Sequence, residues 1–122
     1  MLIESMAEHN ELGVKGEEWA EEFLIQKGYE ILAKNWRAHK FEIDLIAKKN
    51  GEIVFVEVKT RGTEYFGSPD ESINEYKENH LLSGAEYYLN LHEIDLEARF
   101  DVIAIIIEKG QYELRHIENA LG

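Results

Sequence analysis

The fold of this chain is decided by residues 41–61, which read Phe-Glu-Ile-Asp-Leu-Ile-Ala-Lys-Lys, then Asn50-Gly51, then Glu-Ile-Val-Phe-Val-Glu-Val-Lys-Thr-Arg. Two runs of alternating apolar residues flank the Asn-Gly pair, which favours a type I′ turn because both of its residues tolerate positive φ. The stretch therefore predicts an antiparallel hairpin. With a two-residue loop, Asp44 lies opposite Glu57, and Glu42 lies opposite Lys59.

Side chains on a strand alternate between the two faces of a sheet. The hairpin is thus expected to place Glu42, Asp44, Glu57 and Lys59 on one face. The other face is apolar and is formed by Ile43, Leu45, Val54, Val56 and Val58. Like charges that face each other across a sheet destabilise it by up to about 1 kcal/mol, so stability alone does not select a pair of carboxylates.

A divalent cation would turn this repulsion into ligation. Hard cations such as Mg²⁺ take one or two carboxylates together with water and substrate phosphate. Asp44 and Glu57 are therefore candidate metal ligands. Lys59 follows Glu57 by two residues on the same face, where it can orient a water or hold a phosphate.

The composition indicates one ordinary globular domain. The 122 residues suffice for one hydrophobic core but not for two. The chain has no cysteine, which excludes disulfides, thiolate catalysis and cysteine-based zinc sites. It has neither an apolar run of about 20 residues nor the basic and apolar start of a signal peptide. We expect a cytoplasmic domain over residues 1–122 with no membrane partner, in which residues 1–9 are frayed.

The charge is unevenly distributed along the chain. A net charge of −12 argues against simple nucleic-acid binding, which depends on Lys and Arg side chains that neutralise phosphates. Residues 34–61, however, contain seven basic and four acidic side chains, whereas the remainder contains 6 basic and 21 acidic ones. Positive charge therefore gathers around the hairpin, and Arg37, Lys40 and Arg61 are candidate nucleic-acid contacts.

A first helix is predicted over residues 10–27, with Asn10 as its N-cap and Gly28 as its C-terminal stop. Glu17 lies at the edge of its apolar stripe, where most Glu side chains are simply solvated. Gly13 and Gly16 share one face, and each weakens a helix by about 1 kcal/mol relative to Ala. This cost indicates a close approach to a neighbouring element or to a substrate.

Residues 29–37 have the pattern of an edge strand, which extends the hairpin to a three-strand antiparallel meander. Ser68 and Pro69 mark the start of a second helix that reaches about residue 90. Lys77 and His80 of this helix can reach a phosphate, although a snorkelling Lys and a surface His are simpler interpretations. The buried stripe of the helix is predicted to comprise Ile73, Leu81, Ala85 and Tyr88.

The loop before this helix carries Tyr65 and Phe66, which can either stack on a base or pack over the sheet edge. After the helix, residues 102–107 form a continuous β-branched and Ala run, typical of a strand buried on both faces. We expect strands at residues 98–108 and 111–117, joined by a turn at Lys109-Gly110. The connection through the helix makes the third and fourth strands parallel neighbours. The predicted class is α/β, with helices flanking a mixed sheet.

Asp44 and the run Glu57-Val58-Lys59, with a helical Glu upstream, resemble the PD-(D/E)xK nuclease superfamily. A longer set of residues, spread over nearly the whole chain, is similar to the YraN-like family of small bacterial proteins. The set comprises Gly13, Gly16-Glu17, Ala20, Phe23-Leu24, Gly28-Tyr29, Asn35, Arg37, Glu42-Ile43-Asp44-Leu45-Ile46, Phe55-Val56-Glu57-Val58-Lys59, Arg61, Phe66-Gly67, Lys77, Ala85, Tyr88-Leu89 and Arg99-Phe100-Asp101.

The resemblance implies a restriction-endonuclease-like fold, similar to that of archaeal Holliday-junction resolvases. It also implies an endonuclease that depends on Mg²⁺ or Mn²⁺ and hydrolyses phosphodiester bonds in DNA or structured nucleic acid. Asp44, Glu57 and the Val58 carbonyl would then be metal ligands, and Lys59 would position the water. Glu17 would approach the metal from the first helix. Lys77 matches a polar position of the second helix and would contact nucleic acid.

Two residues depart from the family pattern. Phe41 stands where Gly is usual and is expected to crowd the approach to its strand, and His80 stands where Arg is common. Two alternatives to a nuclease stay open: a non-catalytic module of the same fold that binds nucleic acid or protein, and surface ion pairs of Lys59 with Glu57 and Glu42. A homodimer through the apolar last strand is compatible with the sequence but not required by it.

Overall fold

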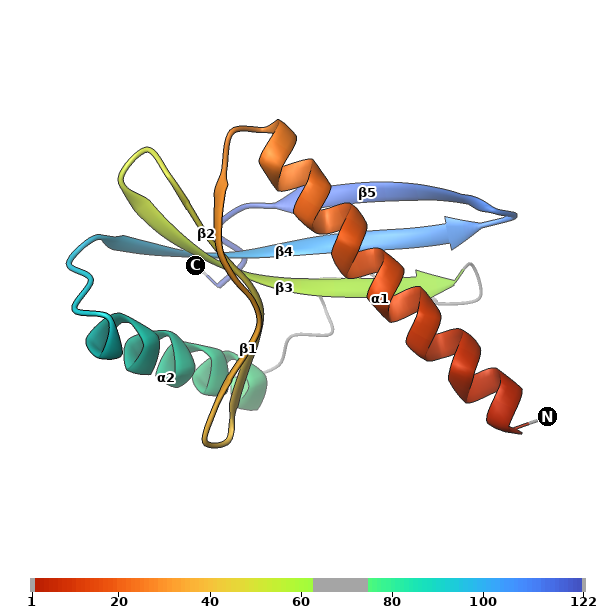
Figure 1. Cartoon of the computed structure of the whole chain (residues 1–122), viewed down its shortest axis with the longest axis horizontal. Coiled ribbons are helices and arrows are strands. Elements are labelled where there is room, and N and C mark those ends of the chain that lie inside the picture. Colours follow the sequence, from red (N-terminus) through yellow and green to blue (C-terminus); the bar gives the residue numbers. More distant parts are fainter. Residues whose placement is uncertain (1, 63–74, 122) are drawn as a thin grey trace.

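The computed structural model describes residues 2–62 and 75–121. The chain forms a five-stranded mixed sheet in the order β1-β2-β3-β4-β5, with helices α1 and α2 (Figure 1). The predicted class, a restriction-endonuclease-like α/β sheet flanked by helices, is confirmed. The elements are α1 (Leu2–Gln26), β1 (Glu30–Ala38), β2 (Phe41–Lys49), β3 (Glu52–Gly62), α2 (Glu75–Leu91), β4 (Glu97–Glu108) and β5 (Gln111–Ile117).

The hairpin between β2 and β3 has the predicted turn and register. Asn50 and Gly51 both have positive φ, of 51° and 79°. The pairs run from Lys49–Glu52 to Leu45–Val56. At that point the β2–β3 ladder ends, whereas β1 and β2 continue to pair as far as Ala38–Phe41. The outer part of the meander is therefore a two-stranded ribbon.

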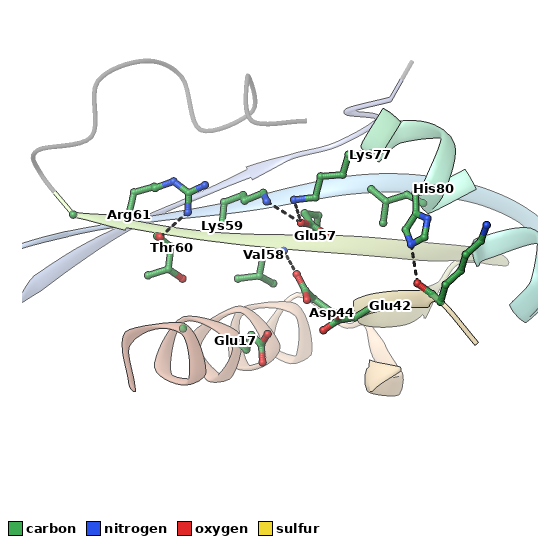
Figure 2. Close-up of a pocket in the computed structure, with 14 residues that line it drawn as sticks. Glu17, Glu42, Asp44, Glu57, Val58, Lys59, Thr60, Arg61, Lys77 and His80 are labelled. Atoms are coloured by element: carbon green, nitrogen blue, oxygen red, sulfur yellow. Dashed lines mark hydrogen bonds and ion pairs between the residues drawn. The ribbon is translucent and has the colours of Figure 1, made fainter. Parts of the chain in front are cut away.

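This ribbon corrects two predictions about the faces of the hairpin. The predicted pairing of Asp44 with Glu57 on one face is wrong, because the ladder ends before this pair and the two side chains lie on opposite sides of β3 (Figure 2). Ile43 does not share a cluster with Leu45, because it packs with Phe55 and Tyr88 in the core beneath α2. Two-stranded ribbons twist more strongly than wide sheets, so residues beyond the end of the ladder turn away from the face that simple alternation assigns to them.

Each face of the sheet has its own hydrophobic core. The core under α1 joins Ala20 and Leu24 to side chains from β2, β3 and β4. The core under α2 contains Leu81, Ala85 and Tyr88, which confirms the part of the predicted stripe that lies within the described residues. The strand β4 is buried from Asp101 to Ile105, as its β-branched run predicts.

The helix α1 is longer than expected. It begins at Leu2, so residues 2–9 are helical and the predicted start at Asn10 is wrong. This segment is rich in Leu, Met, Ala and Glu, whose intrinsic helix propensity is high, and it forms a helix without showing a periodic pattern. The predicted stop is confirmed, because the helix ends at Gln26 and Gly28 has a φ of 91°.

The strands β3 and β4 are parallel along their whole paired length, from Glu52–Glu97 to Gly62–Ile107. The predicted crossover through α2 is thus confirmed. The predicted cap at Ser68 and Pro69 and the loop aromatics Tyr65 and Phe66 lie outside the described residues. In the described part of the chain, neither helix is both long and apolar enough to cross a membrane.

Candidate functional site

The site lies where β2 and β3 separate. Beyond Val56, β3 remains paired with β4 on one side, but its other edge has left the β2 ladder. The Asp44 carboxylate closes this edge, since the Val58 N–H donates a hydrogen bond to Asp44 Oδ2 at 2.8 Å (Figure 2). At this fork between β2 and β3, a side chain rather than a strand backbone bonds to the edge of β3. The hydrogen bond places the Asp44 carboxylate beside the middle of β3.

A pocket of about 780 Å³ opens at this fork. Its walls come from four elements: α1, the end of the β1–β2 ribbon, β3 and the start of α2. The pocket gathers every residue expected to act in catalysis or metal binding, namely Glu17, Asp44, Glu57, Val58 and Lys59. Of the predicted nucleic-acid contacts, it is lined by Lys40, Arg61 and Lys77.

Glu57 is held by two lysines. Lys59 Nζ lies 2.9 Å and Lys77 Nζ 2.8 Å from Glu57 Oε1. The Glu57 and Lys59 side chains are each only 11% exposed, so the interpretation of this pair as a surface ion pair is wrong. Burial opposes ionisation of Glu57, but the hydrogen bonds from Lys77 and Lys59 prevail and lower its pKa below the usual value.

Asp44 shows the opposite behaviour. Burial and the neighbouring Glu57 charge raise the pKa of Asp44 from 3.8 to about 7, against the single hydrogen bond from the Val58 backbone. The Glu17 charge raises it further. In Figure 2, Asp44 and Glu17 lie below β3, while Glu57 extends above it toward Lys77. The two carboxylates therefore lie on opposite sides of β3, and their pKa values are shifted in opposite directions.

The two lysines also differ from each other. Burial and the neighbouring Lys77 lower the pKa of Lys59 below its usual value. The pKa of Lys77 is raised, because its contacts with Glu57 outweigh its burial. Lys59 is therefore the lysine that gives up a proton more readily.

The first helix approaches β3 closely enough to place Glu17 in the pocket. Gly16 is buried, and a Cβ at this position would overlap the Thr60 hydroxyl. The predicted close approach of α1 is thus confirmed at Gly16, whereas a Cβ at Gly13 would meet nothing. Glu17 follows Gly16 directly, so this contact fixes its position. Thr60 itself lines the pocket, a position that no sequence pattern predicts.

The basic residues divide into two groups. Arg61 lines the pocket and donates from Nη1 to the Thr60 carbonyl at 3.0 Å. Arg37 instead pairs with Glu42 at 3.1 Å on the exposed part of the ribbon. Glu42 therefore does not face Lys59, as the extended hairpin register had predicted, because the β2–β3 ladder ends before it.

The two departures from the family pattern contact each other, since Phe41 packs against α2 and His80 is part of that helix. Phe41 packs on Gly84, where an added Cβ would stand 3.2 Å from the Phe41 Cβ. Its ring centroid is 5.3 Å from that of His80. His80 Nε2 lies 2.9 Å from the Lys40 carbonyl. Phe41 thus does not crowd the site as expected, because its ring packs against α2 at Gly84, which has no side chain.

The donor set of the pocket fits a divalent cation held by two carboxylates. Asp44 and Glu57 offer hard oxygens, and the Glu57 charge is close enough to raise the pKa of Asp44. Mg²⁺ requires only one or two protein carboxylates. The fit is not a closed cage. Among residues 13–62 and 75–121, no group of three or more His, Asp or Glu side chains is arranged to hold a metal. Water and phosphate would have to complete the coordination.

A second polar cluster is structural rather than part of the site. Asp101 is buried and accepts hydrogen bonds from Arg99 Nε and Nη2, both at 2.9 Å, and from the Asn119 N–H at 3.2 Å. Its Oδ2 lies 2.7 Å from His116 Nε2. Burial opposes ionisation of Asp101, but these hydrogen bonds hold its pKa below the usual range. The Arg99-Phe100-Asp101 motif thus serves to join β4 to the C-terminal turn.

Comparison with known proteins identifies relatives along the whole chain. The profile of the uncharacterised protein family UPF0102 matches residues 16–105. A UPF0102 protein of Christiangramia forsetii is 46% identical over 115 residues, which cover 94% of this chain and 97% of that protein. A UPF0102 protein of Phocaeicola vulgatus is 41% identical over 94% of this chain and 95% of its own length.

A third relative gives the same result. A UPF0102 protein of Syntrophomonas wolfei is 42% identical over 92% of this chain and 98% of its own length. These matches confirm the resemblance to the YraN-like proteins and include every residue of the pocket from Gly16 onward. The chain belongs to the uncharacterised protein family UPF0102.

Proposed function

We propose that this protein is a metal-dependent phosphodiesterase that cleaves DNA or structured nucleic acid. One observation carries the proposal: two carboxylates with opposite pKa shifts, Asp44 and Glu57, line one pocket at an open strand edge. Carboxylates with perturbed pKa values gather at functional sites. Asp44 and Glu57 would hold Mg²⁺ or Mn²⁺, and the carbonyl of Val58, the residue after Glu57, would be a third ligand.

Cationic side chains surround these carboxylates. Lys59 and Lys77 contact Glu57, and Lys40 and Arg61 line the same pocket. A phosphodiester carries negative charge, so this arrangement offers it counter-charges on several sides. The pocket therefore suits a substrate that brings phosphate to a carboxylate pair.

The residues of the chain have distinct roles in this proposal. When bound, the metal would polarise the phosphoryl oxygen and lower the pKa of a water. Lys59, whose own pKa is lowered, orients that water and can accept or return a proton. Glu17 adds negative charge next to Asp44 and positions solvent on the α1 side. Arg61 and Lys40 hold the flanking phosphates.

A cleavage panel tests the proposal. Junction, flap, single-stranded and duplex DNA are incubated with the protein and Mg²⁺ or Mn²⁺, and matched RNA substrates follow. Asp44→Asn and Lys59→Met should each abolish metal-dependent cleavage. Arg115→Met is the matched control, because Arg115 pairs with Glu113 on β5 outside the pocket. Cleavage that survives Asp44→Asn unchanged would show that the assignment is wrong.

A non-catalytic binding module is the second candidate, and one observation favours it. The Glu57 carboxylate is already neutralised by two lysines, and the described residues contain no closed metal cage. This candidate predicts binding of nucleic acid without hydrolysis. A salt titration separates nucleic acid from a protein partner, since phosphate contacts give a steep decrease of affinity with salt.

A further inference from the structure

One carboxylate of the pocket binds two cationic side chains through the same atom. Lys59 Nζ at 2.9 Å and Lys77 Nζ at 2.8 Å both contact Glu57 Oε1. Together the two ammonium groups carry the charge of one divalent cation. Since like charges at this range repel, the two lysines oppose the approach of a cation to the Glu57 carboxylate.

The structure indicates which lysine can yield. Lys59 lies on β3 two residues from Glu57, and its side chain is 11% exposed. Lys77 reaches the same oxygen from α2, across the pocket, and its side chain is 35% exposed (Figure 2). Lys77 is therefore the more exposed of the two lysines and reaches Glu57 from a separate element, whereas Lys59 is held beside Glu57 by the strand that they share.

We propose that Lys77 gates the cation site: it neutralises Glu57 when no divalent cation is bound, and it leaves this carboxylate when a cation binds. The inference rests on the proposed function, because it takes Asp44 and Glu57 as the ligands of the cation. On release, the Lys77 ammonium turns into the pocket that Lys40 and Arg61 also line. There it meets a phosphate of the nucleic acid.

This exchange couples two binding events. The cation replaces the charge that Lys77 supplied to Glu57, and the phosphate receives the charge that Lys77 carried. Each ligand therefore makes the other easier to bind, and by linkage the effect is reciprocal. A positioning role of this kind differs from a plain phosphate contact, because it predicts that removal of Lys77 strengthens binding of the metal alone.

Binding of Mn²⁺ alone tests the proposal, measured by titration calorimetry and by the electron paramagnetic resonance signal of free Mn²⁺. Lys77→Met should tighten Mn²⁺ binding by about tenfold or more, the effect of one unit charge near a dication even at the dielectric constant of water. Lys40→Met is the matched control. It removes a charge from the same pocket but not from Glu57, and should change the affinity by less than about threefold.

The outcomes separate this inference from the proposed function. If the wild-type protein binds Mn²⁺ and Lys77→Met binds it equally or more weakly, Lys77 is not a gate, and the metal site stands. If neither protein binds Mn²⁺ at millimolar concentration, both proposals fail. Lys77→Gln provides the same comparison if the Met variant does not fold. Lys77→Arg keeps the charge and should show no gain in affinity.

Discussion

The opposite pKa shifts of Asp44 and Glu57 predict opposite effects of two nearly isosteric substitutions. Each replaces a carboxylate by an amide of the same shape, so packing and the hydrogen bond that Asp44 accepts from Val58 are retained. The metal-free protein is the relevant state, and EDTA in the buffer ensures it. Asp44→Asn should stabilise this state at alkaline pH, and Glu57→Gln should destabilise it.

The sign follows from linkage. The pKa of Asp44 is about 7 in the folded protein and near 3.8 in the unfolded chain. A raised pKa means that the contribution of Asp44 to stability is fully present below pH 3.8 and is lost as the pH rises through 7. The difference corresponds to about 4 kcal/mol. Asn cannot ionise, so Asp44→Asn should gain up to about this amount at pH 8 and nothing near pH 4.

Glu57 provides the contrast. Its pKa is lowered, so its contribution is present above its unfolded value of 4.5 and is lost as the pH falls below that value. Glu57→Gln removes a hydrogen-bonded charge and leaves two lysines side by side, at a cost of about 2 kcal/mol at pH 8.

Urea unfolding followed by the fluorescence of Trp19 and Trp36 measures these differences at each pH from 5 to 8. Comparison of each variant with the wild type at the same pH cancels the titration of all other groups. The reasoning is refuted if Asp44→Asn is no more stable than the wild type at pH 8. It is also refuted if the gain is the same at pH 5, because a gain from ionisation must grow with pH.

Two further predictions concern the elements that hold the site. Gly16→Ala and Gly13→Ala gain the same helix propensity of about 1 kcal/mol, but only the former forces a methyl group against Thr60. Urea unfolding should therefore find Gly16→Ala the less stable by about 1 to 3 kcal/mol, and equal stabilities would contradict the close approach. Arg99→Met should cost about 3 to 5 kcal/mol, because it leaves the buried Asp101 carboxylate without its bidentate partner. Most of that loss should disappear in the Arg99→Met, Asp101→Asn double variant, and an unchanged loss would show that packing dominates.

The sequence predicts the sheet well because its signals are local. Asn50-Gly51 fixes the turn and hence the register of five residue pairs, and the β-branched run predicts the buried strand β4. The side-chain faces near Ile43 could not be predicted in this way. They depend on where β2 leaves β3, and no local pattern encodes the end of a ladder.

The candidate site was predictable in its members but not in its contacts. Glu57 and Lys59 share a face, as strand alternation predicts. Asp44 could be recognised from its place in the hairpin, but its position on the other side of β3 could not. The pairing of Lys77 with Glu57 arises from the packing of α2 against the sheet, a contact between residues 20 positions apart. The packing of Phe41 against Gly84 is likewise a contact between residues far apart in the sequence. Neither residue alone predicts it.

The fork between β2 and β3 also has a consequence for how copies of this chain behave toward each other. An open strand edge in the middle of a sheet offers unpaired backbone groups to any other strand, which is a route to aggregation. Here the Val58 N–H is taken by Asp44, and the charged side chains of Glu57, Lys59 and Arg61 follow along the same edge. Replacement of these charged residues by apolar ones would remove the candidate site and would also leave a strand edge that can pair with other chains. Loss of activity in such variants should therefore be interpreted together with their solubility.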